Sequence, residues 1–396
     1  MKVVYNALSV RPGVFDGATT FSLNIVPELA EALAGDGLVV VVREDETRFP
    51  STERLRLERV ALPAAGMARL AYETIGLRRL LRRLGSDVFV SPNESLPLGL
   101  PCASVVVAQN LVYHCGSVEG EEFRADRLRD RLAIGARAGY YRWSMPRAYR
   151  RATRVAAVSE TTARVLEAGA ALDAVKTRVV LEGADSRLLP SVEGVQREPR
   201  LLVVSSLSPY KGFERTLGLF AELHRHRPEL GLDIVGSDWR GFGAHVERRV
   251  SALGLREVVR FLGELPPLEL AERYARSLAL LMLSECESFG LPLVEAMRYG
   301  LPVISSGRSS LAEIAAGAAL EIGDDRGQAV RAVLGLLADE RAREDLAARG
   351  FVRAAELTWR SAGLALASVV REAYAAGQPA TPAETPVRAP ESARPR

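Results

Sequence analysis

Residues 284–306 read SECESFGLPLVEAMRYGLPVISS and carry two carboxylates eight positions apart, Glu287 and Glu295. An apolar run at 278–283 precedes the pair and a β-branched run at 302–305 follows it, so a strand, a helix and a second strand are expected in succession. Units of this kind build parallel sheets covered by helices, and their ligands bind at the carboxyl ends of the strands.

The expected helix has a defined start. Pro292 favours its first turn, because proline has a φ that already suits a helix and its missing N–H would be unpaired there in any case. The free N–H groups of a helix that begins near Leu291 form an anion site, and Gly290 allows a ligand to approach the backbone closely. Glu287 then lies at the mouth of that site, and Glu295 lies one turn inside the helix.

The same alternation of strands and helices runs along the whole chain. Short apolar runs predict strands at 2–8, 38–43, 87–91, 103–109, 154–159, 178–182, 201–206, 232–236, 258–262, 278–283 and 302–305. Helical patterns are expected at 19–34, 67–84, 123–151, 327–338 and 340–355. The predicted fold class is therefore α/β, with two doubly wound, Rossmann-like domains.

Length and local composition divide the chain. Its 396 residues exceed the roughly 250–300 that one core supports, so two domains are expected. Residues 184–199 have no clear period and contain two prolines, and we interpret them as a linker between domains at 1–183 and 200–358. We expect 359–376 to form a helix that crosses back to the first domain, and the Pro- and Ala-rich segment 377–396 to be a disordered tail.

The charge distribution argues against nucleic acid as a partner. A formal net charge of +3 is too small for a nucleic-acid-binding chain of this size. Only three of the 52 basic residues are lysines, Lys2, Lys176 and Lys211, so a lysine is unusual in this arginine-rich chain. We interpret the Arg-rich helical patterns at 69–83 and 124–154 as solvated faces, with weak peripheral contact to anionic lipid as the alternative.

The cysteines and the first residues bear on the location of the protein. Cys102, Cys115 and Cys286 have no metal-ligand or redox spacing, which favours a reducing compartment. The chain enters a strand pattern without the features of a signal peptide, and no run approaches the roughly 18 apolar residues of a membrane span. The expected location is the cytoplasm, including the inner face of the membrane. No Asp or His cluster has metal-ligand spacing, so no metal or other cofactor is expected.

Two further strand ends carry groups that suit a ligand. SSLSPYKGFERTL at 205–217 ends a strand and opens a helix near Lys211, whose compact charge suits phosphate. Ser310 and Glu313 have the spacing of a capping box, which predicts another helix N-terminus. Because a carboxylate only accepts hydrogen bonds, Glu295 suits two neighbouring ribose hydroxyls and Glu287 suits sugar hydroxyls. A nucleotide-sugar has all of these parts.

These residues resemble the retaining glycosyltransferases of family 4, which have the two-domain GT-B fold, and the resemblance spans most of the chain. Its most specific part is ESFGLPLVEAMRYGLPV at 287–303, which is similar to the family signature of two acids separated by seven residues and followed by Gly-x-Pro-Val. The supporting stretches are SPYKGF at 208–213, LDIVG at 232–236, VRFLGEL at 259–265, SSLAE at 309–313 and FDGATTFSLNIVPELAEAL at 15–33.

The resemblance implies a role for each matching residue. Lys211 would bind the donor diphosphate, Glu295 would bind the ribose, and Glu287 would orient the transferred sugar and stabilise positive charge at its anomeric carbon. Lys211 and Glu287 are therefore the expected catalytic residues. Further donor contacts are expected at Gly17, Ser206, Leu262, Phe289, Gly290, Leu291, Ser310 and Leu311.

The chain departs from the family pattern at two places. Ser205-Ser206 stands where members often have Gly-Arg, which removes a phosphate cation that Arg308 is a candidate to replace. Gln109-Asn110 stands where many members have His-Asp or His-Asn, and His114 lies four residues beyond Asn110. We assign Asn110 and His114 to acceptor binding.

The activity that the resemblance implies is transfer of a sugar from a UDP-, GDP- or ADP-sugar to a hydroxyl of a glycan, lipid or small-molecule acceptor, with retention and without a metal. One alternative is a GT-B phosphorylase or a nucleotide-sugar epimerase or hydrolase, which would consume the donor rapidly without an acceptor. Another is a catalytically silent peripheral binding protein of the same fold, which would bind nucleotide without turnover.

Overall fold

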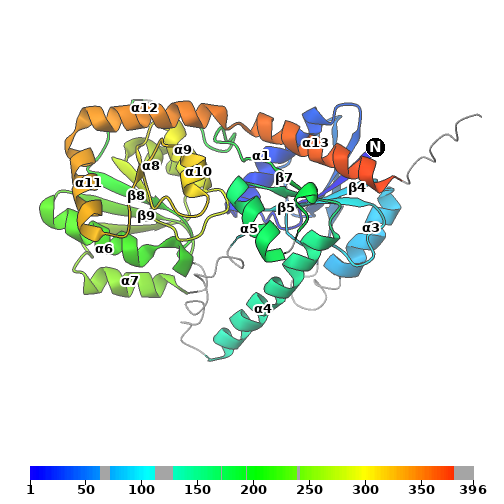
Figure 1. Cartoon of the computed structure of the whole chain (residues 1–396), viewed down its shortest axis with the longest axis horizontal. Helices are drawn as coiled ribbons and strands as arrows, with labels where there is room; N and C mark the ends of the chain where they lie inside the picture. The colour runs from blue at the N-terminus through cyan, green and yellow to red at the C-terminus, as the bar shows by residue number, and fades with distance from the viewer. Residues whose placement is uncertain (63–71, 112–127, 171, 193, 239–240, 379–396) are drawn as a thin grey trace, which may run out of the picture.

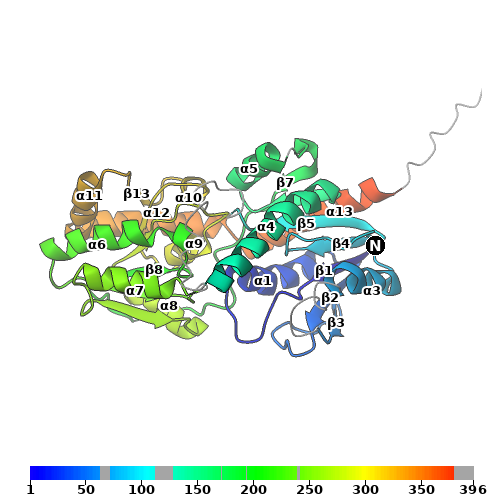
Figure 2. The same ribbon diagram turned by 90° about the horizontal axis from the view of Figure 1, so that it is seen from below.

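The computed structural model describes residues 1–62, 72–111, 128–170, 172–192, 194–238 and 241–378. These residues form two α/β domains, each built on a parallel sheet with helices packed against it (Figures 1 and 2). The predicted fold class is confirmed. Almost all of the expected tail lies outside the described residues.

The first domain contains, within the described residues, a seven-stranded sheet in the order β3-β2-β1-β4-β5-β6-β7. Its strands are β1 (Lys2–Asn6), β2 (Gly37–Arg43), β3 (Leu55–Val60), β4 (Val88–Ser91), β5 (Ala103–Ala108), β6 (Arg154–Ala157) and β7 (Thr177–Val179). Strand β1 lies inside the sheet, where Val4 pairs with Val39 of β2 and Phe89 of β4. Val3, Val4 and Tyr5 in its middle are fully buried, as expected for an inner strand of a sheet that is covered on both faces.

The second domain contains, in the part of the chain that the structure describes, a six-stranded sheet in the order β10-β9-β8-β11-β12-β13. Its strands are β8 (Arg200–Val204), β9 (Gly231–Val235), β10 (Val259–Gly263), β11 (Ala279–Met282), β12 (Val303–Ser305) and β13 (Leu320–Glu321). The strand order reverses between β8 and β11, and such reversals open the crevice in which doubly wound folds bind ligands.

Helices connect these strands and cover the sheets. The described ones are α1 (Gly17–Ala32), the π-helix η1 (Tyr72–Gly76), α3 (Leu77–Leu84), α4 (Leu128–Arg151), α5 (Glu160–Ala170), the short η3 (Ala174–Lys176) and η4 (Pro209–Lys211), α6 (Phe213–His226), α7 (Gly243–Ala252), α8 (Pro267–Arg276), α9 (Leu291–Arg298), α10 (Leu311–Ala315), α11 (Arg326–Ala338), α12 (Glu340–Glu356) and α13 (Trp359–Gly377). None of the described helices is both long and apolar enough to cross a membrane.

The eleven predicted strands all form, each within three residues of its expected ends. Two strands were not predicted, β3 and β13. Strand β3 lies at the edge of its sheet, and half of its residues are charged, so it lacks the apolar run that marks the inner strands. Strand β13 has only two residues, which is too short for any periodicity.

The two domains share buried apolar surface. One continuous cluster contains Val3 and Phe21 of the first domain, Leu293 and Leu311 of the second, and Trp359 of α13. A further cluster, which includes Leu201 and Phe220, belongs to the second domain alone. Apolar packing therefore holds the domains together beside the loops that carry the predicted site.

The last two helices run one after the other along both domains, α12 against α9 and α13 against α1 (Figure 1). The ring of Trp359, at the start of α13, meets the ring of Phe21 edge-on at 5.7 Å between centroids. Its backbone N–H donates to Oδ1 of Asp185 at 2.7 Å. At Gly363, α13 lies so close to α1 that a Cβ there would be 2.5 Å from Cβ of Glu28.

This close approach leads to a stability prediction. The substitution Gly363→Ala should lower the free energy of unfolding by about 1–3 kcal/mol, because the added methyl group pushes α13 away from α1. The matched control is Gly335→Ala in α11, where a Cβ would meet no heavy atom within 4 Å. That change should stabilise the helix by up to about 1 kcal/mol. Thermal and urea unfolding of both variants would test this, and equal effects would contradict it.

Candidate functional site

A cavity of about 960 Å³ lies between the domains, lined by residues of both. Its walls come mainly from the loops that follow strands of the two sheets, among them Ser9 after β1, Gln109 after β5, Ser206 after β8 and Glu287 after β11. The volume is at the upper end of the roughly 300–1,000 Å³ that small-molecule sites occupy. The site therefore has room for a ligand of several rings.

Lys211 reaches this cavity from the turn after β8. Helix η4 ends at Lys211, and Gly212 follows with a φ of +70°. A Cβ on Gly212 would lie 2.1 Å from the carbonyl oxygen of Leu283, so glycine is required both for the backbone conformation and for packing against the loop after β11. This close packing places Lys211 beside Glu287.

Helix α9 begins at Leu291, as the position of Pro292 predicts. Gly290 precedes it with a φ of +101°, and a Cβ there would lie 2.9 Å from Cδ2 of Leu311 and 3.3 Å from Cε of Met282. The glycine is thus required by its backbone conformation and by packing within the domain. The expected reason, close approach of a ligand, is not needed to explain it.

Lys211 and Glu287 form a buried ion pair, with Nζ 2.7 Å from Oε1. Burial by itself would lower the pKa of Lys211, but the Glu287 carboxylate and the hydrogen bond to it more than offset this, so the pKa is raised. The ammonium is therefore charged at neutral pH. It has three N–H donors, and the bond to Glu287 uses one of them.

Glu295 lies one turn inside α9 and is 7% exposed. Its Oε2 accepts a hydrogen bond from the hydroxyl of Tyr274 at 2.8 Å, and the ring of Tyr299 stacks on that of Tyr274. Burial raises the pKa of Glu295 to about 7, although the Tyr274 hydroxyl opposes the shift. This carboxyl group is consequently protonated more readily than that of an exposed glutamate.

The turn that connects the two acids is bonded to the first domain. The carbonyl oxygen of Ser288 accepts from Oγ of Ser159 at 2.6 Å and from Oγ1 of Thr162 at 3.0 Å. The side-chain Oγ of Ser288 accepts from the backbone N–H of Leu111 at 3.0 Å. The loop that carries Glu287 is thus part of the contact between the domains.

The helix N-terminus predicted at Ser310 is confirmed, because α10 begins at Leu311, but the predicted capping box does not form. Ser310 makes no side-chain capping bond in α10, and its Oγ instead donates to the carbonyl oxygens of Glu287 and Phe289 at 3.0 and 3.1 Å. Glu313 accepts from the backbone N–H groups of Glu160 and Thr161, at 2.7 and 2.8 Å, at the start of α5 in the first domain. Glu313 therefore binds the N-terminus of α5, far away in the sequence, and not the nearby backbone of Ser310. This contact is favourable because the N-terminus of a helix carries a partial positive charge.

The structure brings most of the predicted donor residues to one place. Besides Lys211 and the two acids, the cavity is lined by Gly17, Ser206, Phe289, Gly290 and Leu291, and by Asn110 of the predicted acceptor site. Three others do not line it. Leu262 packs on the core, Leu311 lies under Gly290, and Ser310 supports the backbone of the Glu287 turn. His114 lies outside the described residues.

Arg308, the candidate for the second phosphate cation, does not line the cavity. Its guanidinium contacts Glu285 and, at 2.6 Å, Oδ1 of Asp324. Among the described residues of the lining, the basic side chain besides Lys211 is Arg11, which belongs to the loop between β1 and α1. Within the described part of the chain, no group of three or more His, Cys, Asp or Glu side chains could hold a metal ion.

Two buried acids of the first domain were not predicted. Glu94 follows β4 with a φ of +54° and accepts from the backbone N–H groups of Gln109 and Asn110 at 2.8 and 2.7 Å. Glu182 follows β7, and burial, with added repulsion from Glu295 and Glu287, raises its pKa to about 8. Glu94 follows the expected strand 87–91 and Glu182 is the last residue of the expected strand 178–182, so their position at strand ends was the available signal.

Comparison with known proteins identifies the class. Residues 22–183 match the model of the glycosyl transferase 4-like domain, and residues 188–353 match that of the glycosyl transferases group 1. The chain belongs to the family 4 glycosyltransferases of the GT-B fold.

Individual relatives agree with that assignment. Over 98 residues the chain is 37% identical to the serotype-specific mannosyltransferase WbdA of Escherichia coli, a match that spans 25% of this chain and 12% of that protein. The sucrose-phosphate synthase of Thermosynechococcus elongatus superposes with a TM-score of 0.71 at 21% identity, over 95% of this chain and 99% of that one. Anabaena HepE in complex with UDP-glucose superposes with a TM-score of 0.68 at 17% identity, over 93% and 98%.

The buried acids lead to a prediction about pH and stability. Because the pKa of Glu182 rises from 4.5 in the unfolded chain to about 8 in the folded protein, the folded state binds more protons between these values. The free energy of unfolding should therefore fall as pH rises from 4.5 to about 8 and then level off. In Glu182→Gln this fall should be shallower by up to about 1.4 kcal/mol per pH unit.

Urea unfolding between pH 5 and 8 measures this slope. Glu53→Gln, the same change at an exposed position, is the control and should keep the wild-type slope. Identical slopes for wild type and Glu182→Gln would contradict the assignment of a buried, protonated carboxyl group.

Proposed function

We propose that the protein is a retaining glycosyltransferase that moves a sugar from a nucleoside diphosphate to an acceptor hydroxyl. The observation that carries this proposal is the buried pair of Lys211 and Glu287 at the strand ends of the second sheet, with Glu295 behind it, in a cavity shared by both domains. The named activity of WbdA and the UDP-glucose of the HepE complex support the same class of reaction.

Lys211 would bind the leaving diphosphate. Departure of a nucleoside diphosphate builds negative charge on phosphate oxygens, and a preorganised cation in a buried site stabilises that charge better than solvent does. The ion pair with Glu287 fixes Nζ in advance and leaves two of its N–H donors for phosphate. The N-terminus of α9 adds its free N–H groups, and Arg11 would supply the second cation from the first domain.

Glu287 would act on the sugar. Positive charge develops at the anomeric carbon as the diphosphate leaves, and a carboxylate nearby stabilises it. Glu287 is 8% exposed and fixed by Lys211, so its role would be orientation and charge stabilisation, with the acceptor attacking from the side of the leaving group. This route retains the anomeric configuration.

Glu295 would hold the ribose. The hydrogen bond from Tyr274 occupies Oε2, and no partner of Oε1 is present among the described residues. Two neighbouring hydroxyls of a ribose can donate to the carboxylate, which makes a UDP-, GDP- or ADP-sugar the expected donor. We further propose that the reaction occurs in the cytoplasm, without a metal, on a glycan, lipid-linked or small-molecule acceptor.

Nucleotide binding tests the donor site. UDP, GDP and ADP are screened by thermal shift, and the matching nucleotide at 100 times its dissociation constant should stabilise the protein by about 2.7 kcal/mol. Lys211→Ala should abolish the shift, whereas Lys176→Ala, which removes one of the two other lysines at a site remote from the cavity, should not. No shift with any of the three nucleotides would contradict the proposal.

The ribose role has its own test. The 2′-deoxy form of the matching nucleotide should bind about tenfold more weakly, because loss of one hydroxyl leaves the buried Glu295 short of a donor. In Glu295→Ala the two forms should bind equally. Equal binding of both forms by the wild type would exclude this role.

A further inference from the structure

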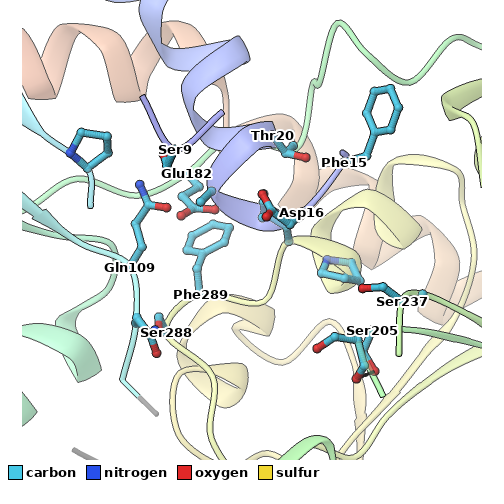
Figure 3. A pocket seen from close by; sticks show the side chains of 18 of the residues that line it. Ser9, Phe15, Asp16, Thr20, Gln109, Glu182, Ser205, Ser237, Ser288 and Phe289 are labelled. Carbon is cyan, nitrogen blue, oxygen red and sulfur yellow. Dashed lines mark hydrogen bonds between the residues drawn. The ribbon is translucent and has the colours of Figure 1, made fainter. Parts of the chain in front are cut away.

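Glu182 is a buried acid in the cavity wall. The residue is 5% exposed, and among the residues that the structure describes its carboxyl group forms no hydrogen bond and no ion pair. Buried carboxyl groups are normally paired, because an unpaired one forfeits its solvation. Figure 3 shows the side chain pointing into the cavity above the ring of Phe289.

Two more polar groups at this end of the cavity have no hydrogen-bond partner among the residues that the structure describes. Nε2 of Gln109 and Oγ of Ser9 are buried and have no hydrogen bond within the described parts of the chain. Both residues line the cavity, and in Figure 3 they point toward the same region as Glu182. The three come from different strand ends, after β5, β1 and β7. Three unsatisfied groups that converge on one space indicate a place for a ligand.

We propose that Glu182, Gln109 and Ser9 form a subsite for the hydroxyl groups of a sugar ring. This inference deepens the proposed sugar transfer and rests on it. It gives a function to Gln109, which stands where the chain departs from the family pattern, and to two residues that no sequence motif marks.

The chemistry of the three groups selects uncharged hydroxyls. Burial raises the pKa of Glu182 to about 8, so at neutral pH its carboxyl group is mostly protonated and can both donate and accept. Gln109 offers an N–H donor, and the hydroxyl of Ser9 can donate or accept. A sugar hydroxyl, which donates one bond and accepts others, can satisfy each of them.

Charged ligand groups fit less well. Among the residues that the structure describes, the ionisable side chains that line the cavity are seven acids and two bases, Arg11 and Lys211, so the acids that are ionised would repel an anion away from the lysine. The seven acids are Asp16, Glu73, Glu94, Glu182, Glu264, Glu287 and Glu295. An ammonium group has only donors and would leave the N–H of Gln109 unpaired.

The hydroxyls have two sources, the transferred sugar of the donor and the acceptor, and binding assays distinguish them. Calorimetry compares UDP with UDP-glucose and GDP with GDP-mannose for wild type, Glu182→Ala and Glu182→Gln. If the transferred sugar occupies the subsite, Glu182→Ala should weaken binding of the nucleotide-sugar about tenfold and leave the nucleoside diphosphate unchanged. Glu182→Gln keeps a donor and an acceptor and should bind as the wild type does.

If the acceptor occupies the subsite, Glu182→Ala should change the affinity for neither UDP-glucose nor GDP-mannose. Saturation-transfer NMR with methyl α-glucoside and methyl α-mannoside on the nucleotide-loaded protein should then show binding to wild type and Glu182→Gln, and none to Glu182→Ala. Gln109→Ala should reproduce the loss in whichever assay responds, and Glu53→Gln should change neither. Wild-type behaviour of Glu182→Ala in both assays would overturn the subsite.

The two proposals fail in different ways. Absence of nucleoside diphosphate binding by the wild type refutes the proposed donor site. Normal nucleotide binding together with insensitivity of every sugar ligand to Glu182→Ala refutes the subsite alone. Circular dichroism and the melting temperature of each variant show whether it is folded. If Glu182→Ala does not fold, Gln109→Ala keeps the test decisive, because it should show the same loss and wild-type behaviour of it in both assays would overturn the subsite.

Discussion

The turn Glu287–Gly290 is the feature on which the rest of the site depends. It follows the central strand β11 and starts α9, so its backbone position is set by the sheet on one side and by the left-handed Gly290 on the other. Its carbonyl groups are shared: Ser309 and Ser310 of the second domain donate to that of Glu287, and Ser159 of the first domain donates to that of Ser288. The same four-residue turn thus orients an acid and joins two domains.

The site buries several acids but few cations, and this burial has an energetic cost. Glu182, Glu287 and Glu295 are each less than 10% exposed, and the structure gives a cation, Lys211, to Glu287 and a neutral donor, Tyr274, to Glu295. Removing a carboxylate from water without a counter-charge costs several kcal/mol per ion unless the group becomes protonated. Burial therefore favours the protonated forms of Glu182 and Glu295 and raises their pKa values. Such shifts are characteristic of sites arranged for a ligand.

The sequence predicted what depends on local signals. Strand positions followed from apolar runs, and the grouping of Lys211, Glu287 and Glu295 followed from their place at the ends of neighbouring parallel strands. The role of Glu313 could not be predicted in this way, because its partner at the start of α5 lies about 150 positions away and the capping-box spacing pointed to Ser310 instead. Glu182 and Glu94 look like ordinary acids after a strand, and only the folded domains show that both are buried and face the same cavity.

The contact between the domains explains why a site with unpaired polar groups can persist. Glu313 accepts three hydrogen bonds from Glu160 and Thr161, and Ser288 adds three more with Ser159, Thr162 and Leu111. Together with the shared apolar cluster, these bonds hold the two walls of the cavity together. The free energy gained at the contact between the domains offsets the cost of the unpaired polar groups beside it. These groups are then available to bind a ligand.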